Sequence, residues 1–498
     1  MKKIKRLLIA NRGEIACRIV ASCRAMGIET VTVYAPDDKD LPHARAGDFA
    51  VLLDGTSLAE TYLNIEKLIK VAKDSGADAI HPGYGFLSEN ARFSEAVAKA
   101  GLIFVGPTAE VIRMMGDKAE SRMLCEEINV PCVPGYNGDA TDTKTLSEEA
   151  EKIGYPVLVK AAAGGGGKGM RIVHEPKELP EALESARSEA KNAFGDERLL
   201  IEKYLVEPRH IEVQVFSDTH GNHLHLFERE CSIQRRYQKI VEESPSPQLD
   251  ESLRKKMTEE AVKITSHINY TGAGTVEFIV SNKGEFYFLE MNTRLQVEHP
   301  VTEMVTGLDL VRLQIEVAQG EKLPIAQKDI KQNGHSIEVR LYAEDSDKGF
   351  LPSPGTLREF VTPNLPHVRV EKGYASGNTV SAGYDPMIAK LAVWGETRDE
   401  AISRMLNVLS QTQVNGVINN RAFLMRVLDH VAFREGKTAT SFIEEHKESL
   451  FDHTHDDTET AALAAVYLLF GSSAAQATSS GEQEEHSAWT HSKVAGMR

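Results

Sequence analysis

Apolar runs and helical repeats alternate in the N-terminal part of the chain. The segments that carry this pattern are the apolar runs at 7–10, 77–80 and 102–105, the helical repeat at 15–26 and the β-prone run at 30–34. Strands that alternate with helices in this way pair in parallel and are covered by helices on both faces. The first part of the chain is therefore predicted to form a doubly wound parallel sheet.

Two loops fall at the carboxyl ends of these strands, where ligands of such sheets gather. They are residues 11–14 and 81–85, and neither is a dinucleotide fingerprint, because Ser88 stands where the third glycine belongs. Taken alone, both loops are better interpreted as simple turns.

A glycine-rich segment lies between two apolar runs over residues 155–173. It is not a P-loop, because no Ser or Thr follows Gly167-Lys168 and the pattern that follows is a strand. Consecutive glycines leave backbone N–H groups free to approach phosphates. A flexible linker is the alternative, but a linker is not expected inside a short hairpin, so we predict a lid that covers phosphates.

A second predicted hairpin carries facing acids. The runs 275–280 and 285–289 are β-prone, and a two-residue loop at 283–284 places Glu277 opposite Glu290, with Asn292 and Arg294 on the same face. Facing carboxylates repel each other unless a cation lies between them, and Mg²⁺ favours such oxygen ligands. From the hairpin alone, a solvated sheet face is an equally good interpretation.

Further strands are predicted at 199–205, 210–215 and 336–341, and the last of these places Glu338 and Arg340 on one face. The charged segment 228–239 is predicted to be a loop. It is either a solvated face or, beside a phosphate or bicarbonate site, a source of anion-binding cations.

Composition limits the partners and the compartment. The chain has 498 residues, 41% of them hydrophobic, and a net charge of −16, which disfavours non-specific nucleic-acid binding. Its 5 cysteines form no CxxC pair, so a reducing cytoplasm fits. We expect no signal peptide and no membrane span.

Five motifs in order resemble those of the biotin carboxylase family of ATP-grasp ligases. They are residues 9–16, 81–90, 115–118, the glycine loop and 290–300. The resemblance covers residues 4–450 and implies ATP-driven carboxylation of biotin by bicarbonate through carboxyphosphate. It implies an α/β and α+β multidomain fold: an N-terminal Rossmann-like domain (1–116), an ATP-grasp domain (117–330) with a lid at about 135–204, a mixed α+β C-terminal domain (331–450) and a flexible tail (451–498).

The resemblance also implies a role for each matched position. ATP would contact Lys118, Lys160, Gly166, Gly167, Glu202, Lys203, Tyr204, Leu205, His210, Gln234, Tyr237, Glu277 and Glu290. Mg²⁺ or Mn²⁺ would bind Glu277, Glu290 and Asn292. Bicarbonate would bind Lys239, Arg294, Gln296 and Val297. Among the catalytic residues Lys239, Arg294, Glu298 and Arg340, Glu298 would be the general base, and Arg340 would stabilise charge on the biotin ureido oxygen.

Two positions depart from the family pattern: Ala163 replaces the first glycine of the loop, and Tyr237 stands where many members have histidine. The chain lacks an Ala-Met-Lys-Met motif, so a separate biotin carboxyl carrier and a carboxyltransferase are implied, with a homodimer expected. Residues 487–489 and 496–498 resemble the linker that follows this domain in longer acyl-CoA carboxylase α-chains.

The carboxyl acceptor is left open by the chain. Our first expectation is acetyl-CoA carboxylase of fatty acid synthesis, and the alternatives are propionyl-CoA and methylcrotonyl-CoA carboxylases. Another ATP-grasp ligase, such as a carbamoyl-phosphate synthetase half, and a catalytically silent nucleotide-binding subunit are the competing functions.

Overall fold

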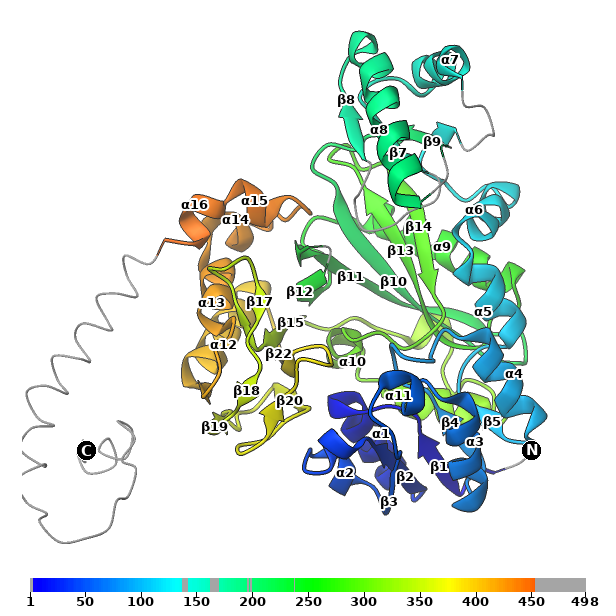
Figure 1. The fold of residues 1–498 in the computed structure, drawn as a ribbon, viewed down its shortest axis with the longest axis vertical. Helices are drawn as coiled ribbons and strands as arrows, with labels where there is room; N and C mark the ends of the chain where they lie inside the picture. Colours follow the sequence, from blue (N-terminus) through cyan, green and yellow to red (C-terminus); the bar gives the residue numbers. More distant parts are fainter. Residues whose placement is uncertain are drawn as a thin grey trace, which may run out of the picture. The chain divides into compact units, whose positions relative to one another are not determined.

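The N-terminal segment forms the predicted parallel sheet in the computed structural model (Figure 1). Its strands are β1 (Arg6–Ile9), β2 (Glu29–Tyr34), β3 (Phe49–Leu52), β4 (Ala79–His81) and β5 (Ile103–Phe104), in the order β3-β2-β1-β4-β5. Side chains alternate across β1, so Leu7 and Ile9 pack with α1 (Gly13–Ala25), whereas Leu8 packs with α3 (Ile65–Asp74) and α4 (Ala91–Lys99). The doubly wound arrangement is confirmed.

The structure describes residues 3–136, 142–161, 170–194, 197, 199–236 and 238–452. Several predicted features lie outside these ranges: Ala163, Gly166 and Gly167 of the glycine loop, Tyr237, and the tail beyond 452. The described residues up to 445 belong to one compact unit, and the described residues 446–452 belong to another.

A four-stranded sheet carries the hairpin that flanks the glycine loop. Its strands are β6 (Gly135–Tyr136), β9 (Leu199–Lys203), β7 (Val157–Ala161) and β8 (Arg171–Val173), in that order. Helices α7 (Thr143–Ile153) and α8 (Leu179–Phe194) share an apolar core with this sheet (Figure 1). The predicted strands on both sides of the glycine loop are confirmed, since β7 and β8 pair in antiparallel fashion.

The largest sheet has eight antiparallel strands. In spatial order they are β14 (Phe286–Asn292), β13 (Gly272–Val280), β10 (Arg209–Ser217), β11 (His223–Arg235), β12 (Gln238–Ser244), β15 (His335–Tyr342), β22 (Met387–Gly395) and β20 (Val368–Lys372). The sheet is continuous across our predicted domain boundary at 330/331, because β12 pairs directly with β15.

The prediction of a loop over 228–239 is wrong. Most of this segment belongs to the paired strands β11 and β12, and Glu228, Arg229 and Glu230 are buried. The density of charge pointed to a solvated loop, whereas buried charges of this segment have partners elsewhere in the fold. Arg229 pairs with Glu212 on β10, and Glu228 pairs with Arg254 on the helix Glu251–His267. The strict alternation of His223-Leu224-His225-Leu226 was the signal for a strand.

Alternation along the large sheet separates an apolar face from a charged face. Ile211, Val213, Val276 and Phe278 pack against α9 (Glu251–His267). The residues between them project to the other face, where α10 (His299–Thr306) contacts β15 and β22. The charged residues described below lie on that face.

The remaining elements are short or flank the sheets. They are α2 (His43–Ala46), α5 (Ala109–Gly116), α6 (Lys118–Glu127), α11 (Leu310–Ala318), α12 (Arg398–Gln411), α13 (Arg421–Asp429), α14 (Val431–Arg434), α15 (Phe442–Glu445), α16 (Lys447–Leu450), β16 (Glu344–Asp345), β17 (Leu351–Pro352), β18 (Gly355–Thr356), β19 (Glu359–Val361), β21 (Thr379–Val380) and β23 (Gln413–Asn415). Short 3₁₀ turns occur at Pro36–Asp38, Leu58–Glu60, Pro176–Glu178 and Gln327–Asp329. The described part of the chain contains no helix with the length and apolar character that a bilayer crossing requires.

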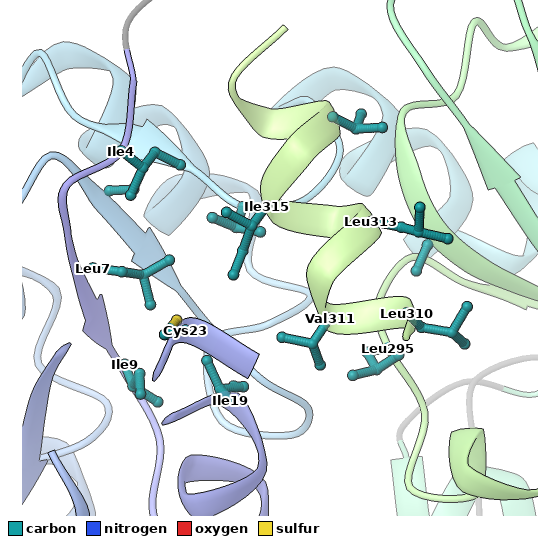
Figure 2. Close-up of a cluster of buried hydrophobic side chains, with 14 of the residues drawn as sticks. Ile4, Leu7, Ile9, Ile19, Cys23, Leu295, Leu310, Val311, Leu313 and Ile315 are labelled. Carbon is teal, nitrogen blue, oxygen red and sulfur yellow. The ribbon is translucent and has the colours of Figure 1, made fainter. Parts of the chain in front are cut away.

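Helix α11 joins the two large layers through one apolar core. Figure 2 shows Val311 and Ile315 directed toward Leu7, Ile19 and the rest of the N-terminal layer. The same core includes side chains of the large sheet: Phe216, Leu224, Leu226 and Ala273. The parallel sheet and the charged face are therefore fixed relative to one another by packing.

We predict that Ile315→Ala lowers the free energy of unfolding by about 2–5 kcal/mol, because Ile315 is fully buried and its loss leaves a cavity. Leu351→Ala is the matched control, since Leu351 is 51% exposed, and its effect should stay within about 0.5 kcal/mol. Denaturant titration of both variants measures the difference. Equal effects would mean that α11 is not part of the common core.

Candidate active site

The β13–β14 hairpin places Glu277 opposite Glu290, as predicted. The loop is one residue longer than we expected, because Ser281 N–H donates to the Glu285 carbonyl at 2.8 Å. A β-bulge at Leu289 compensates, since Phe278 pairs with Phe288 while Glu277 pairs with Glu290. The predicted loop length is therefore wrong, but the facing of the two acids is confirmed.

Lys239 on β12 is the centre of the charged face. Its ammonium group contacts Glu212 Oε1, Glu277 Oε1 at 3.1 Å and Glu298 Oε1 at 2.8 Å. An ammonium group has three N–H donors, and each has an acceptor here. Burial lowers the pKa of Lys239, but Glu277 and Glu298 outweigh this effect, so its pKa lies above the ordinary value and the ammonium form is retained.

Glu277 is enclosed by donors. Its Oε1 accepts from Asn292 Nδ2 at 2.7 Å and Gln296 Nε2 at 2.9 Å, and its Oε2 lies 2.8 Å from His210 Nε2. Burial raises the pKa of Glu277, but Lys239 and His210 more than offset this, so its pKa is lowered and the carboxylate is ionised.

The hairpin acids fit a hard divalent cation. Carboxylate oxygens on neighbouring strands, one of them on the partly exposed Glu290, are the donors that Mg²⁺ prefers. Glu277 and Asn292 fit less directly than Glu290. Both oxygens of Glu277 already face the donors described above, and the Asn292 oxygen accepts from Arg294 at 2.9 Å. Ligand atoms of His210, Glu212 and Glu277 also lie within 4.8 Å of one another, but Lys239 already contacts both of these carboxylates.

Glu298 immediately precedes α10 and bridges two cations. Its Oε1 accepts from Lys239, and its Oε2 accepts from an Arg340 guanidinium nitrogen at 3.0 Å. Arg340 also donates to Glu242 Oε1 at 2.6 Å through Nε. Burial raises the pKa of Glu298, but Lys239, Arg340 and Arg229 together hold its pKa well below the ordinary value.

Arg229 is a fully buried cation to which sequence reasoning assigned no role. Its guanidinium group donates to Gln214 Oε1 (2.7 Å), Thr302 Oγ1 (3.0 Å), Glu212 Oε2 (3.1 Å), Thr275 Oγ1 (3.1 Å) and Gln296 Oε1 (2.8 Å). It therefore fixes the side chains of Gln296 and Glu212 by hydrogen bonds to their oxygen atoms. Glu212, Glu242 and Arg229 were missed because their partners come from other strands.

The residues expected to contact ATP form a second group. Lys160 Nζ lies 2.6 Å from Glu202 Oε2, and Arg122 holds the other oxygen of Glu202 at 3.2 Å. Lys118 Nζ lies 3.0 Å from Glu290 Oε2, which links this group to the β13–β14 hairpin. Three further expected residues have neighbours of their own: Gln234 Nε2 lies 2.8 Å from His210 Nδ1, Lys203 Nζ donates to the Gly154 carbonyl at 3.0 Å, and Tyr204 N–H donates to the Pro156 carbonyl at 3.0 Å. Leu205 follows β9 and is half-buried.

A cavity of about 510 Å³ opens beside Arg340 and Val297. A second part of its wall comes from the two segments that follow β1 and β4, including Asn11, Glu14 and Tyr84. Asn11 Nδ2 joins these loops by donating to the Pro82 and Tyr84 carbonyls at 2.7 and 2.8 Å. The interpretation of these loops as simple turns is therefore too limited.

Arg294 lines the cavity and is held by Glu89, which belongs to the motif at 81–90 and had no predicted role. Glu89 Oε2 accepts from Arg294 Nε at 2.8 Å, and its Oε1 accepts from Thr293 N–H at 3.1 Å. An ion pair and a backbone hydrogen bond thus connect the loop after β4 with the segment after β14.

Carboxylates that suit Mg²⁺, lysines beside them and a neighbouring cavity with an arginine are features of an ATP-dependent ligase. Family models agree with this class: Biotin carboxylase, N-terminal domain matches residues 3–112, Carbamoyl-phosphate synthase L chain, ATP binding domain matches 117–326, and Biotin carboxylase C-terminal domain matches 338–445.

Curated relatives and solved structures give the same result. The chain is 50% identical over 441 residues to Biotin carboxylase 2 of Bacillus subtilis, covering 89% of this chain and 99% of that protein. It is 48% identical over 500 residues to the mitochondrial methylcrotonoyl-CoA carboxylase subunit alpha of Dictyostelium discoideum, covering 100% and 71% of the two chains. The biotin carboxylase domain dimer of Hydrogenobacter thermophilus 2-oxoglutarate carboxylase, solved with MgADP, ADP and bicarbonate, has a TM-score of 0.83 at 45% identity, covering 91% and 100% of the two chains.

The chain belongs to the biotin carboxylase family, whose members are ATP-dependent ligases that use ATP, Mg²⁺ and biotin. The predicted family, fold class and cofactors are confirmed, and the flanking matches disfavour a carbamoyl-phosphate synthetase half. The chain spans 62 to 66% of the length of five further methylcrotonoyl-CoA carboxylase alpha subunits. It spans 71% of the Ruegeria pomeroyi propionyl-CoA carboxylase alpha chain at 48% identity.

We predict that Glu290→Gln raises the Mg²⁺ concentration needed for half-maximal activity by at least roughly tenfold, because it removes one carboxylate from the facing pair. Glu285→Gln makes the same charge change at the end of the same hairpin, away from the facing pair, and should leave the requirement unchanged. Titration of phosphate release with Mg²⁺ compares the two. Equal requirements in the two variants would show that Glu290 is only a surface acid.

Proposed function

We propose that the chain carboxylates biotin, using ATP and bicarbonate, as the first half-reaction of an acyl-CoA carboxylase of the methylcrotonoyl-CoA or propionyl-CoA type. The observation that carries the reaction is the position of Glu298 between Lys239 and Arg340, at the edge of the cavity that Val297 and Arg340 line. The matched relatives favour this alternative over acetyl-CoA carboxylase, which was our first expectation.

Lys118 and Lys160, with Glu202 and His210 nearby, are proposed to bind the ATP phosphates, and Glu277 and Glu290 are proposed to hold Mg²⁺. The metal, when bound, neutralises charge on the phosphates. Lys239, Arg294, Gln296 and Val297 are proposed to bind bicarbonate beside them. Arg229 would orient Gln296 for this role, since it donates to the Gln296 oxygen at 2.8 Å.

Glu298 is proposed to take the bicarbonate proton. The bicarbonate oxygen then attacks the γ-phosphorus of ATP, ADP leaves, and carboxyphosphate forms. The carboxyl group next passes to a biotin nitrogen, phosphate leaves, and the departing phosphate takes the proton that this nitrogen loses. Arg340 would stabilise the charge on the ureido oxygen in this step, because its guanidinium group lines the cavity and is held by Glu242.

A carrier protein or domain bearing biotin and a carboxyltransferase are the proposed partners, and a dimer is proposed from the related domain dimer. The match with the Dictyostelium subunit covers the whole chain, which supports the proposed resemblance of the last residues to the α-chain linker. The cytoplasmic location stays a prediction, because that relative is named mitochondrial.

Purified protein should release phosphate from ATP when bicarbonate, Mg²⁺ and free biotin are all present. Phosphate release that does not depend on biotin or bicarbonate would contradict the proposal, and absence of any release would favour a catalytically silent subunit.

The identity of the acyl-CoA acceptor is tested with the partners that co-purify with the chain. Labelled bicarbonate should enter methylcrotonoyl-CoA or propionyl-CoA, and label entering only acetyl-CoA would restore the first expectation.

Glu298→Gln and Arg340→Ala should separate the two halves of the reaction. Glu298→Gln should abolish bicarbonate-dependent ATP cleavage with and without biotin, because the proton is removed before phosphoryl transfer. Arg340→Ala should lower biotin carboxylation on the order of 100–1000-fold, with a much smaller loss of ATP cleavage without biotin. Equal losses in Arg340→Ala would move its role to bicarbonate or nucleotide binding.

A further inference from the structure

Lys390 on β22 is buried between charges and belongs to none of the expected site residues. It is 1% exposed and lies directly opposite Arg340 on β15 and Glu371 on β20. A lysine is almost never buried to this extent unless its ammonium group is paired. The groups that pair with the Lys390 ammonium group therefore indicate which parts of the site this residue positions.

The ammonium group of Lys390 has three partners from three separate segments. It donates to the Val297 carbonyl at 2.5 Å and lies 3.0 Å from Glu371 Oε2 and 3.4 Å from Glu14 Oε1. The contact with Val297 is a hydrogen bond, whereas the two carboxylate contacts are ion pairs. Glu371 is held in turn by Arg369, so it serves as a fixed counter-charge.

The Val297 carbonyl belongs to the peptide unit that ends in the nitrogen of Glu298. Because a peptide unit is planar, a strong hydrogen bond to this carbonyl fixes the orientation of the backbone from which the Glu298 side chain departs. Charge-assisted hydrogen bonds of this kind are stronger than neutral ones. Lys390 therefore acts on the proposed base through its backbone, whereas Lys239 and Arg340 act on its carboxylate.

Glu14 extends the same arrangement to the other wall of the cavity. Its Oε1 accepts from the Tyr84 hydroxyl, and Glu14, Tyr84, Val297 and Arg340 all line the cavity. The Lys390 ammonium group also lies 6.0 Å from the centre of the Tyr84 ring. One buried cation thus connects both walls.

We propose that Lys390 is a positioning residue for biotin carboxylation, which fixes the Val297–Glu298 peptide on one wall of the cavity and the Glu14–Tyr84 pair on the other. This role presupposes the activity proposed above. Lys390 does not line the cavity itself, so its effect on substrates passes through these partners.

The role predicts a specific pattern of loss. In Lys390→Met both walls are released, so bicarbonate-dependent ATP cleavage should fall with and without biotin, by on the order of 10- to 100-fold in kcat. In Glu14→Gln and Tyr84→Phe only the far wall changes, so ATP cleavage without biotin should be retained while the KM for biotin rises. The KM for ATP should be unchanged in all three variants.

A second readout is the pH dependence of kcat/KM for biotin. Burial raises the pKa of Glu14 to about 7, Lys390 opposes this rise, and Glu371 and Tyr84 are the other ionisable groups that face it. Without Lys390 the pKa of Glu14 should rise further, so the acid limb of the profile should move to higher pH in Lys390→Met. In Glu14→Gln this limb should disappear. A purely structural lysine would not shift it.

Two variants control for folding. Lys390→Met/Glu371→Gln removes the cation together with one counter-charge and should show the same losses if Lys390→Met does not fold. Arg398→Met removes a cation from Glu243, which lies on the opposite face of the same sheet, and should lower stability without changing activity per folded molecule.

The outcomes separate the two proposals. Wild-type protein without biotin- and bicarbonate-dependent phosphate release would overturn the proposed function. Active wild-type protein together with unchanged kcat, KM and pH profile in Lys390→Met, or in the double variant, would overturn only the role of Lys390. Loss of the biotin-dependent steps alone in Lys390→Met would overturn its action on the Glu298 peptide.

Discussion

The contact of Lys239 with three buried carboxylates is the constraint on which the site depends. Glu212 comes from β10, Glu277 from β13 and Glu298 from the segment before α10, so one ammonium group fixes three parts of the chain. Removing one partner of a buried charge cluster leaves uncompensated charge, which typically costs about 3–5 kcal/mol. The geometry of the site and the stability of the central sheet therefore cannot be changed independently.

Periodicity in the sequence was sufficient to predict the parallel sheet and the facing of two acids in the hairpin, but not the strands of the charged segment 228–239. The parallel sheet followed from the spacing of apolar residues between Leu7 and Phe104, and the pairing of Glu277 with Glu290 followed from side-chain alternation. The second prediction succeeded although the loop was one residue longer than expected, because the exposed bulge residue Leu289 restored the register. A bulge of this kind has no reliable sequence signal. The alternation of side chains on either side of it does have one, and that alternation places the two acids on one face.

The partners of the buried charges could not be predicted in the same way. Arg229 is followed by a dense run of charges, and on composition that run suggests a solvated loop. Its five acceptors come from β10, β13, α10 and the segment between β14 and α10, and their proximity depends on the strand order of the whole sheet. The partners of Lys390 were equally hard to predict. Glu14 and Val297 are distant from it in the sequence, and their contacts with it depend on how the parallel sheet packs against the large sheet. Motif resemblance pointed to the residues that we propose to face substrates but not to those that support them.

The charges around Glu298 create a conflict that the proposed reaction has to resolve. Lys239 and Arg340 keep the carboxylate ionised, but a carboxylate with a strongly lowered pKa is a weak base. An anion that attracts Lys239 weakens its hold on Glu298 and raises the pKa of that carboxylate. Bicarbonate is such an anion in the proposed site, because Lys239 and Gln296 are among the residues proposed to bind it. These two side chains lie next to each other, since both donate to Glu277 Oε1. Binding of the substrate would then itself increase the basicity of Glu298, and proton removal would be confined to the molecules in which bicarbonate is bound.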